Sequence, residues 1–109
     1  MRRIALAAWL LGAALAGGGC RGDGEKLADS RRTLASWEST VRLAAAQRQA
    51  NTLPDPFFRD LLRAAREGVE KEERRLDRLA AKGAREAGSL AQEARALLGK
   101  IAALRASVP

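Results

Sequence analysis

The 109-residue sequence contains no histidine, no tyrosine and only one cysteine, and aromatic residues make up 4% of it. Histidine is the most versatile general acid and base near neutral pH, so the serines have no such base to activate them. One cysteine without histidine provides no ligand set for zinc or another soft metal, and it cannot form an internal disulfide. We therefore expect a protein that is not an enzyme and that holds no metal and no cofactor.

Hydrophobic residues make up 47% of the chain and charged residues 30%, and alanine supplies much of the hydrophobic fraction. A chain rich in Ala, Leu, Arg and Glu is typical of helices and of coiled coils. The length suffices for one small domain. These features predict an all-α protein.

The first twenty residues have the parts of a secretory signal peptide. Arg2 and Arg3 precede an apolar run at residues 4–16, and three glycines then lead to Cys20. The apolar run is 13 residues long, which is short for a membrane-spanning helix of about 20 residues. The uncharged stretch through Cys20 reaches 17 residues, so a retained signal anchor remains an alternative.

Within this segment, ALAGGGC at residues 14–20 resembles the lipobox of bacterial lipoproteins. In that family the cysteine thiol receives a diacylglyceryl group, the preceding peptide is removed, and the new amino terminus is acylated. The resemblance implies a signal peptide at 1–19 and a lipid anchor on Cys20. Gly17 departs from the family pattern, which prefers an aliphatic residue there. Cys20 as an incidental thiol behind a plain signal peptide, on a secreted protein, is the alternative.

Arg21 follows the cysteine, where an aspartate often retains Gram-negative lipoproteins at the inner membrane. The resemblance therefore implies a protein on the periplasmic face of the cell envelope, with the outer membrane favoured. Residues 20–25 are Gly-rich and polar and are expected to form a tether, and residues 26–109 a helical domain.

Residues 26–50 have the apolar periodicity of a helix, and residues 51–56 then carry turn chemistry. The residues of the apolar face are Leu27, Leu34, Trp37, Val41 and Ala44. Asp55 followed by Pro56 predicts an N-cap and the first position of a second helix. Reflecting the chain about this turn places Trp37 opposite Val69.

The second helix has an apolar register seven residues apart, which predicts a supercoiling seam. Its members are Leu62, Val69, Leu76, Gly83, Leu90, Leu97 and Leu104. The unbroken register favours one long helix, bent near 83–89. Two glycines and a possible capping box at Ser89 and Gln92 favour two helices instead. The expected fold is an antiparallel helical hairpin with a long second arm, and a three-helix bundle is the alternative.

Four residues are candidate contacts with a partner. Phe57 and Phe58 open the second helix, and one of them must face solvent because adjacent helical positions point about 100° apart. Leu97 and Leu104 lie on the part of the seam that the first helix is too short to cover. That part must bury itself against a folded-back third helix, a second chain or a partner.

The sequence carries a formal net charge of +7 and a pI near 11.0. Between Arg59 and Arg85, pairs such as Arg63–Glu67, Arg66–Glu70 and Glu70–Arg74 at i,i+4 spacing predict a solvated, ion-paired face. Nucleic acid is excluded as a partner by the expected export.

The sequence thus predicts a lipid-anchored envelope protein that acts as a structural or protein-interaction module, with an unknown envelope protein or self-association as partner. The alternatives are a binder of small lipids or apolar ligands at the loosely packed 83–94 seam, and a coiled-coil oligomer held by a signal anchor.

Overall fold

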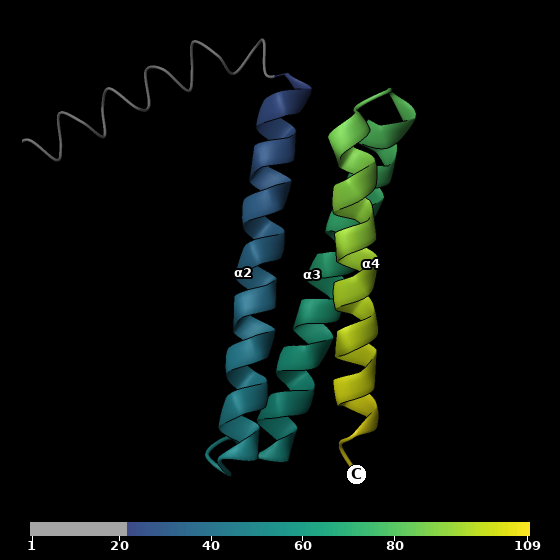
Figure 1. Cartoon of the computed structure of the whole chain (residues 1–109). Coiled ribbons are helices and arrows are strands. Elements are labelled where there is room, and N and C mark those ends of the chain that lie inside the picture. Colours follow the sequence, from purple (N-terminus) through teal and green to yellow (C-terminus); the bar gives the residue numbers. More distant parts are fainter. Residues whose placement is uncertain (1–21) are drawn as a thin grey trace, which may run out of the picture.

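The computed structural model describes residues 22–109, which form α2 (Asp23–Gln49), α3 (Asp55–Ala81) and α4 (Arg85–Ala106) and contain no strand. The helices run side by side, with the α2–α3 turn and the C-terminus at one end and the α3–α4 turn at the other (Figure 1). The all-α class is confirmed in this part of the chain. The three-helix alternative fits it, and the two-helix hairpin does not. Cys20 and the signal-peptide segment lie outside the described residues.

The break between α3 and α4 falls at Gly83, where a single long second helix was expected. Gly83 has φ of 95°, in the left-handed region that favours glycine. The Ala84 N–H donates to the carbonyl of Leu79 at 3.1 Å, and the Gly83 N–H donates to that of Ala80 at 2.9 Å. This is the double hydrogen bond of a Schellman motif, which ends α3 and lets α4 fold back along it.

The end of α2 uses the same motif with an asparagine. Asn51 has φ of 59°, and Asn is the other residue that adopts this conformation with little strain. The Thr52 N–H donates to the carbonyl of Gln47 at 2.9 Å, and the Asn51 N–H donates to that of Arg48 at 3.0 Å. A turn between the helices, predicted at residues 51–56, is present at residues 50–54 and closes the α2–α3 hairpin, whereas Asp55 and Pro56 already belong to α3.

The beginnings of the helices differ from the sequence-based boundaries by a few residues. α2 starts at Asp23, inside the segment expected to be a tether. α3 takes Pro54 as its N-cap, so Asp55 lies in the first turn, where its carboxylate favours the helix dipole. Ser89 lies inside α4, which begins at Arg85, so the expected capping box does not start a helix.

The core runs through the whole bundle and takes its largest side chains from α3. Phe58, Val69 and Leu76 are fully shielded from solvent, and Leu62 is nearly so. α4 packs mainly along α3, and its apolar positions are buried as well: Ala87, Leu90, Ala91, Ala94, Leu97 and Ile101. The apolar seam beyond residue 82 is therefore buried against other helices of the same chain. The small residues at 87–94 fill the core instead of leaving a loose seam.

Ion pairs join the helices in a way that the i,i+4 spacing did not predict. Arg95 of α4 reaches two carboxylates of α3, Glu73 at 2.9 Å and Asp77 at 2.8 Å. Arg31 of α2 meets Glu86 of α4 at 2.8 Å. These contacts fix α4 against both neighbours, although each pair is at least partly exposed and contributes at most about 1 kcal/mol.

Candidate functional site

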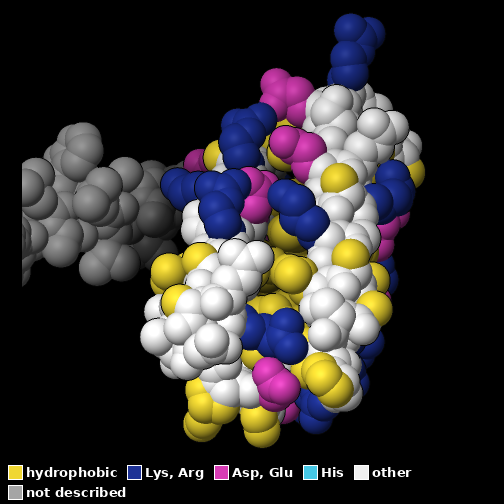
Figure 2. All heavy atoms as spheres, turned by 60° about the horizontal axis from the view of Figure 1, so that its bottom comes forward, with side chains coloured by type: hydrophobic (Ala, Val, Ile, Leu, Met, Phe, Trp, Pro, Cys, Tyr) yellow, Lys and Arg dark blue, Asp and Glu magenta, His cyan; other side chains and the backbone are white. Residues whose placement is uncertain are grey.

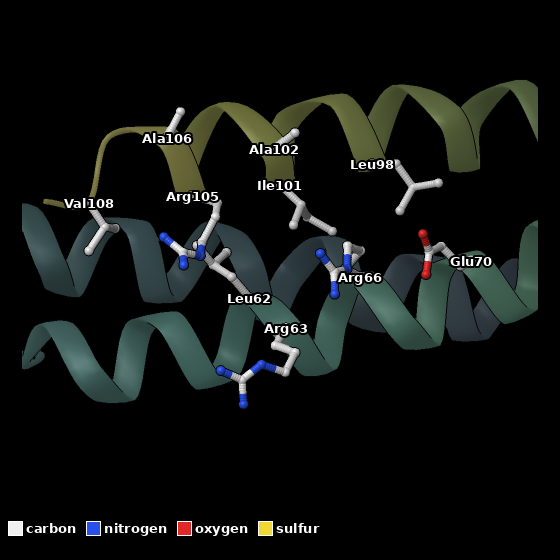
Figure 3. Close-up of a pocket in the computed structure, with 10 residues that line it drawn as sticks. All are labelled: Leu62, Arg63, Arg66, Glu70, Leu98, Ile101, Ala102, Arg105, Ala106 and Val108. Atoms are coloured by element: carbon white, nitrogen blue, oxygen red, sulfur yellow. The ribbon is translucent and has the colours of Figure 1, made fainter.

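A groove of about 700 Å³ lies between α3 and α4 (Figure 3). It occupies the half of the bundle that contains the C-terminus. Its lining comes from two stretches, 62–70 of α3 and 98–108 at the end of α4: Leu62, Arg63, Arg66, Glu70, Leu98, Ile101, Ala102, Arg105, Ala106 and Val108.

The floor of the groove is apolar. Leu62 and Ile101 are almost completely buried and face the core, and Leu98 is half-buried beside them. Val108 follows the end of α4, yet it is 6% exposed because the chain turns back over the helices there. The floor therefore continues the core outward and is open to solvent on one side.

Arginine side chains line the margins of this floor. Arg66 and Arg105 extend into the space between the two helices, whereas Arg63 lies on the outer side of α3 (Figure 3). Arg63 is 3.5 Å from the carboxylate of Asp60. Among the side chains that the structure describes, no carboxylate lies within 4 Å of the Arg66 or Arg105 guanidinium, although Glu70 lies one helical turn from Arg66 in the same lining. Neither guanidinium therefore forms an ion pair there.

Glu70 is the one acidic residue in the lining. It lies beside Leu98, at the end of the groove away from Arg105 and Val108 (Figure 3). The groove therefore has a charge gradient along its length, from arginine at the C-terminal end of α4 to a carboxylate about two helical turns away.

A second hollow opens between α2 and α4 at the end of the bundle that contains the α2–α3 turn. Its lining includes the hydrophobic residues Ala45, Leu53, Phe58 and Leu104 and one basic residue, Arg48. Figure 2 shows hydrophobic and basic side chains side by side on this face of the bundle. The Arg48 Nε–H donates to Asp55 at 3.2 Å, the guanidinium lies 5.1 Å from the ring centroid of Phe58, and Nη1 donates to the Ser107 hydroxyl at 3.5 Å. Arg48 thus ties together the ends of all three helices, which gives it a structural role.

The four expected partner contacts separate into two groups. Phe57 is 66% exposed at the α2–α3 end and Leu104 is half-buried in the second hollow, so both reach the surface. Phe58 and Leu97 do not reach the surface, because their side chains are buried in the helical core. The expectation that one of the two phenylalanines faces solvent is confirmed, and it is Phe57.

Arg66 was expected to pair with Glu70 at i,i+4 spacing, an ion pair that does not form within 4 Å in the described part of the chain. Neither Arg66 nor Arg105 was expected to line a groove. Each follows a core residue by one helical turn, since Arg66 is four residues after Leu62 and Arg105 four after Ile101. This four-residue spacing is the feature of the sequence that could have pointed to the two arginines. It places each arginine beside an apolar position, but only the fold-back at Gly83 brings the two together.

Other functional features are few among residues 22–109. They contain no cluster of three or more histidine, cysteine, aspartate or glutamate side chains suited to a metal ion. No helix in this range has the length and hydrophobicity to cross a membrane. Comparison of the chain with protein-family models, curated proteins and solved structures gave no significant match.

Proposed function

We propose that the protein is a lipid-anchored protein of the bacterial cell envelope whose helical bundle acts as a protein-interaction module. The observation that carries the interaction role is the α3–α4 groove, an apolar surface bordered by two arginines without counter-ions. The lipid anchor rests on the resemblance of residues 14–20 to a lipobox.

The position of the groove suits a protein held at a membrane by Cys20. Only Arg21 and Gly22 separate that cysteine from the first residue of α2. α2 has 27 residues and is therefore about 40 Å long. The groove lies toward the opposite end of the bundle, beside the α2–α3 turn and the C-terminus. An anchored bundle would present this groove away from the lipid surface, where a periplasmic protein can reach it.

Fewer observations support a role as a binder of small apolar ligands than support the interaction role. The apolar floor of the α3–α4 groove favours it, but the 83–94 seam that first suggested it is filled by buried alanines. Sites for small molecules bury most of the ligand surface, whereas this groove is open along one side. A coiled-coil oligomer has less support, since the seam that would form it lies in the core of one chain.

The anchor is tested by expressing the full chain in a Gram-negative host and analysing the mature protein by mass spectrometry. We expect a chain that begins at acylated Cys20 and fractionates with the outer membrane. Cys20→Ser should remain uncut and unacylated. Arg21→Asp, a matched change beside the cysteine, should keep the acyl chains and move the protein to the inner membrane. An unmodified Cys20 in the wild type would show the anchor proposal to be wrong.

A further inference from the structure

We propose that the occupant of the α3–α4 groove is an acidic amphipathic helix of a partner protein. This inference rests on the proposed interaction role and names its partner by chemistry. Three properties of the groove carry it: its shape, its charge and the exclusion of segments of this chain.

The groove has the shape that a short helix requires. Its α3 lining runs from Leu62 to Glu70, a span of eight helical steps or about 12 Å, which equals roughly two helical turns. An amphipathic helix anchors in such a groove through residues at i, i+3 or i+4, and i+7. It buries one face and leaves the other in water, which an open groove allows. An acyl chain in the same place would keep the side that faces the opening of the groove in contact with water.

The charges that line the groove determine which partner helix can bind there. Arg66 and Arg105 project over the apolar floor and meet no carboxylate within the described chain. A partner with glutamate or aspartate beside its apolar stripe supplies the missing counter-ions, and guanidinium groups bind carboxylates in bidentate geometry. Glu70 at the other end favours a neutral or basic residue there. The acidic residues of the partner should therefore gather toward Val108.

Segments of this chain do not meet that description. The 21 residues that precede the described part hold Arg2, Arg3 and Arg21 and no acidic residue. Residues 22–109 hold the other 17 of the 20 basic residues against all 13 acidic ones, so a second copy would bring a net charge of +4 to an arginine-lined groove. Charge complementarity thus selects a partner with an acidic face over the leader segment or another copy.

The test uses three fluorescently labelled peptides of about 15 residues, a length at which isolated helices begin to form in water. One carries leucines at helical spacing with flanking glutamates, the second has the same leucines with lysines, and the third has the glutamates with serines in place of leucines. Anisotropy titrations use the full chain with Cys20→Ser, which leaves every groove residue unchanged. We expect the acidic leucine peptide to bind at least tenfold more tightly than the other two, and less tightly as salt is raised.

Variants then place the peptide in the groove. Arg66→Glu and Arg105→Glu should each weaken binding of the acidic peptide about tenfold, and Arg66→Gln should weaken it less. Lys71→Glu makes a similar charge reversal on an exposed position of α3 outside the groove lining, and should change binding less than twofold. Circular dichroism of each variant checks that the helices remain, and Arg66→Gln keeps the test valid if a charge reversal unfolds the bundle.

Several results would overturn the inference. Equal binding of the acidic and basic leucine peptides would show that charge does not select the partner. Equal loss in Lys71→Glu would place binding outside the groove. Displacement of the acidic peptide by palmitate at stoichiometric concentration would assign the groove to a lipid. None of these results depends on acylation of Cys20, so failure of the anchor and failure of this inference are separate outcomes.

Discussion

The indole of Trp37 in α2 lies directly against the backbone of Gly68 in α3. A Cβ built on Gly68 would be 2.5 Å from Nε1 and 2.6 Å from Cε2 of the indole. Contacts below 3.0 Å are sterically forbidden, so this glycine allows α2 and α3 to approach at the position of the largest side chain on α2. The two helices are held together by this contact and by the apolar residues on both sides of it.

Gly68→Ala should therefore destabilise the protein. Replacing glycine inside a helix ordinarily gains about 1 kcal/mol, but forcing a methyl group into the indole costs about 1–3 kcal/mol. We expect a net loss of up to about 2 kcal/mol in the free energy of unfolding, measured by urea denaturation. Gly99→Ala is the matched control, because nothing lies within 4 Å of a Cβ there, and it should raise stability. Equal gains at both positions would show that the indole moves aside freely.

The pairing of Trp37 was predictable from the sequence to within one residue. Reflection about the turn placed it opposite Val69, and the indole lies on Gly68. The end of α3 was not predictable in the same way. Gly83 continues the seven-residue register, since the tight turn at 82–84 happens to keep the apolar positions of α3 and α4 in phase. Glycine is compatible with a helix and with a positive φ, so periodicity alone does not distinguish a bend from a fold-back.

Gly83→Ala tests the requirement for a positive φ at the α3–α4 turn. An L-residue in the left-handed conformation costs roughly 1–2 kcal/mol, and Gly83 has φ of 95°. We expect a lower thermal midpoint with the helical content unchanged below the transition. Gly88→Ala changes a glycine inside α4 with open space around it, and should instead raise the midpoint. A Gly83→Ala variant more stable than wild type would favour a continuous helix through residue 83.

Arg48→Ala should weaken the end of the bundle where the three helices meet. It removes the ion pair with Asp55 and the contact with the ring of Phe58, together worth about 1–2 kcal/mol. Arg48→Lys should recover only part of this, because a lysine lacks the planar fork that serves several partners. Arg42→Ala removes an exposed pair with Glu38 within α2 and should change stability by less than about 0.5 kcal/mol. Urea denaturation of the three variants provides the comparison.

Ser30→Ala should leave the protein at least as stable as wild type. The Ser30 hydroxyl is fully buried and has no hydrogen-bond partner in the described part of the chain. Removing an unsatisfied buried hydroxyl gains about 1 kcal/mol or more, in addition to the better helix propensity of alanine. Ser39→Ala, on the exposed face of α2, should gain only the propensity difference of about 0.5 kcal/mol. A loss of stability in Ser30→Ala would reveal a partner for the hydroxyl in solution.

The candidate site was less predictable than the fold. Helical periodicity identifies which positions face the core, and it placed Leu97 on the apolar seam, where the structure buries it. It left open which of Phe57 and Phe58 faces solvent. It does not identify which exposed arginines converge, because Arg66 and Arg105 are 39 positions apart and meet only through the antiparallel packing of α3 and α4. Phe57 could be recognised as exposed only once the rotation of α3 about its axis was known.

The last prediction separates a self-contained bundle from an oligomer. Leu97 is 6% exposed within one chain, so Leu97→Asp should place an unpaired carboxylate in the core. Such changes cost more than about 4 kcal/mol, a large part of the stability of a small domain. We expect loss of helicity and of the cooperative thermal transition. Leu43→Asp, at a leucine that is 60% exposed, should melt like the wild type.

Sedimentation should show a monomer at all concentrations, because the seam is already covered. If the wild type were an oligomer that Leu97→Asp converts into folded monomers of full helicity, the seam would be an interface between chains.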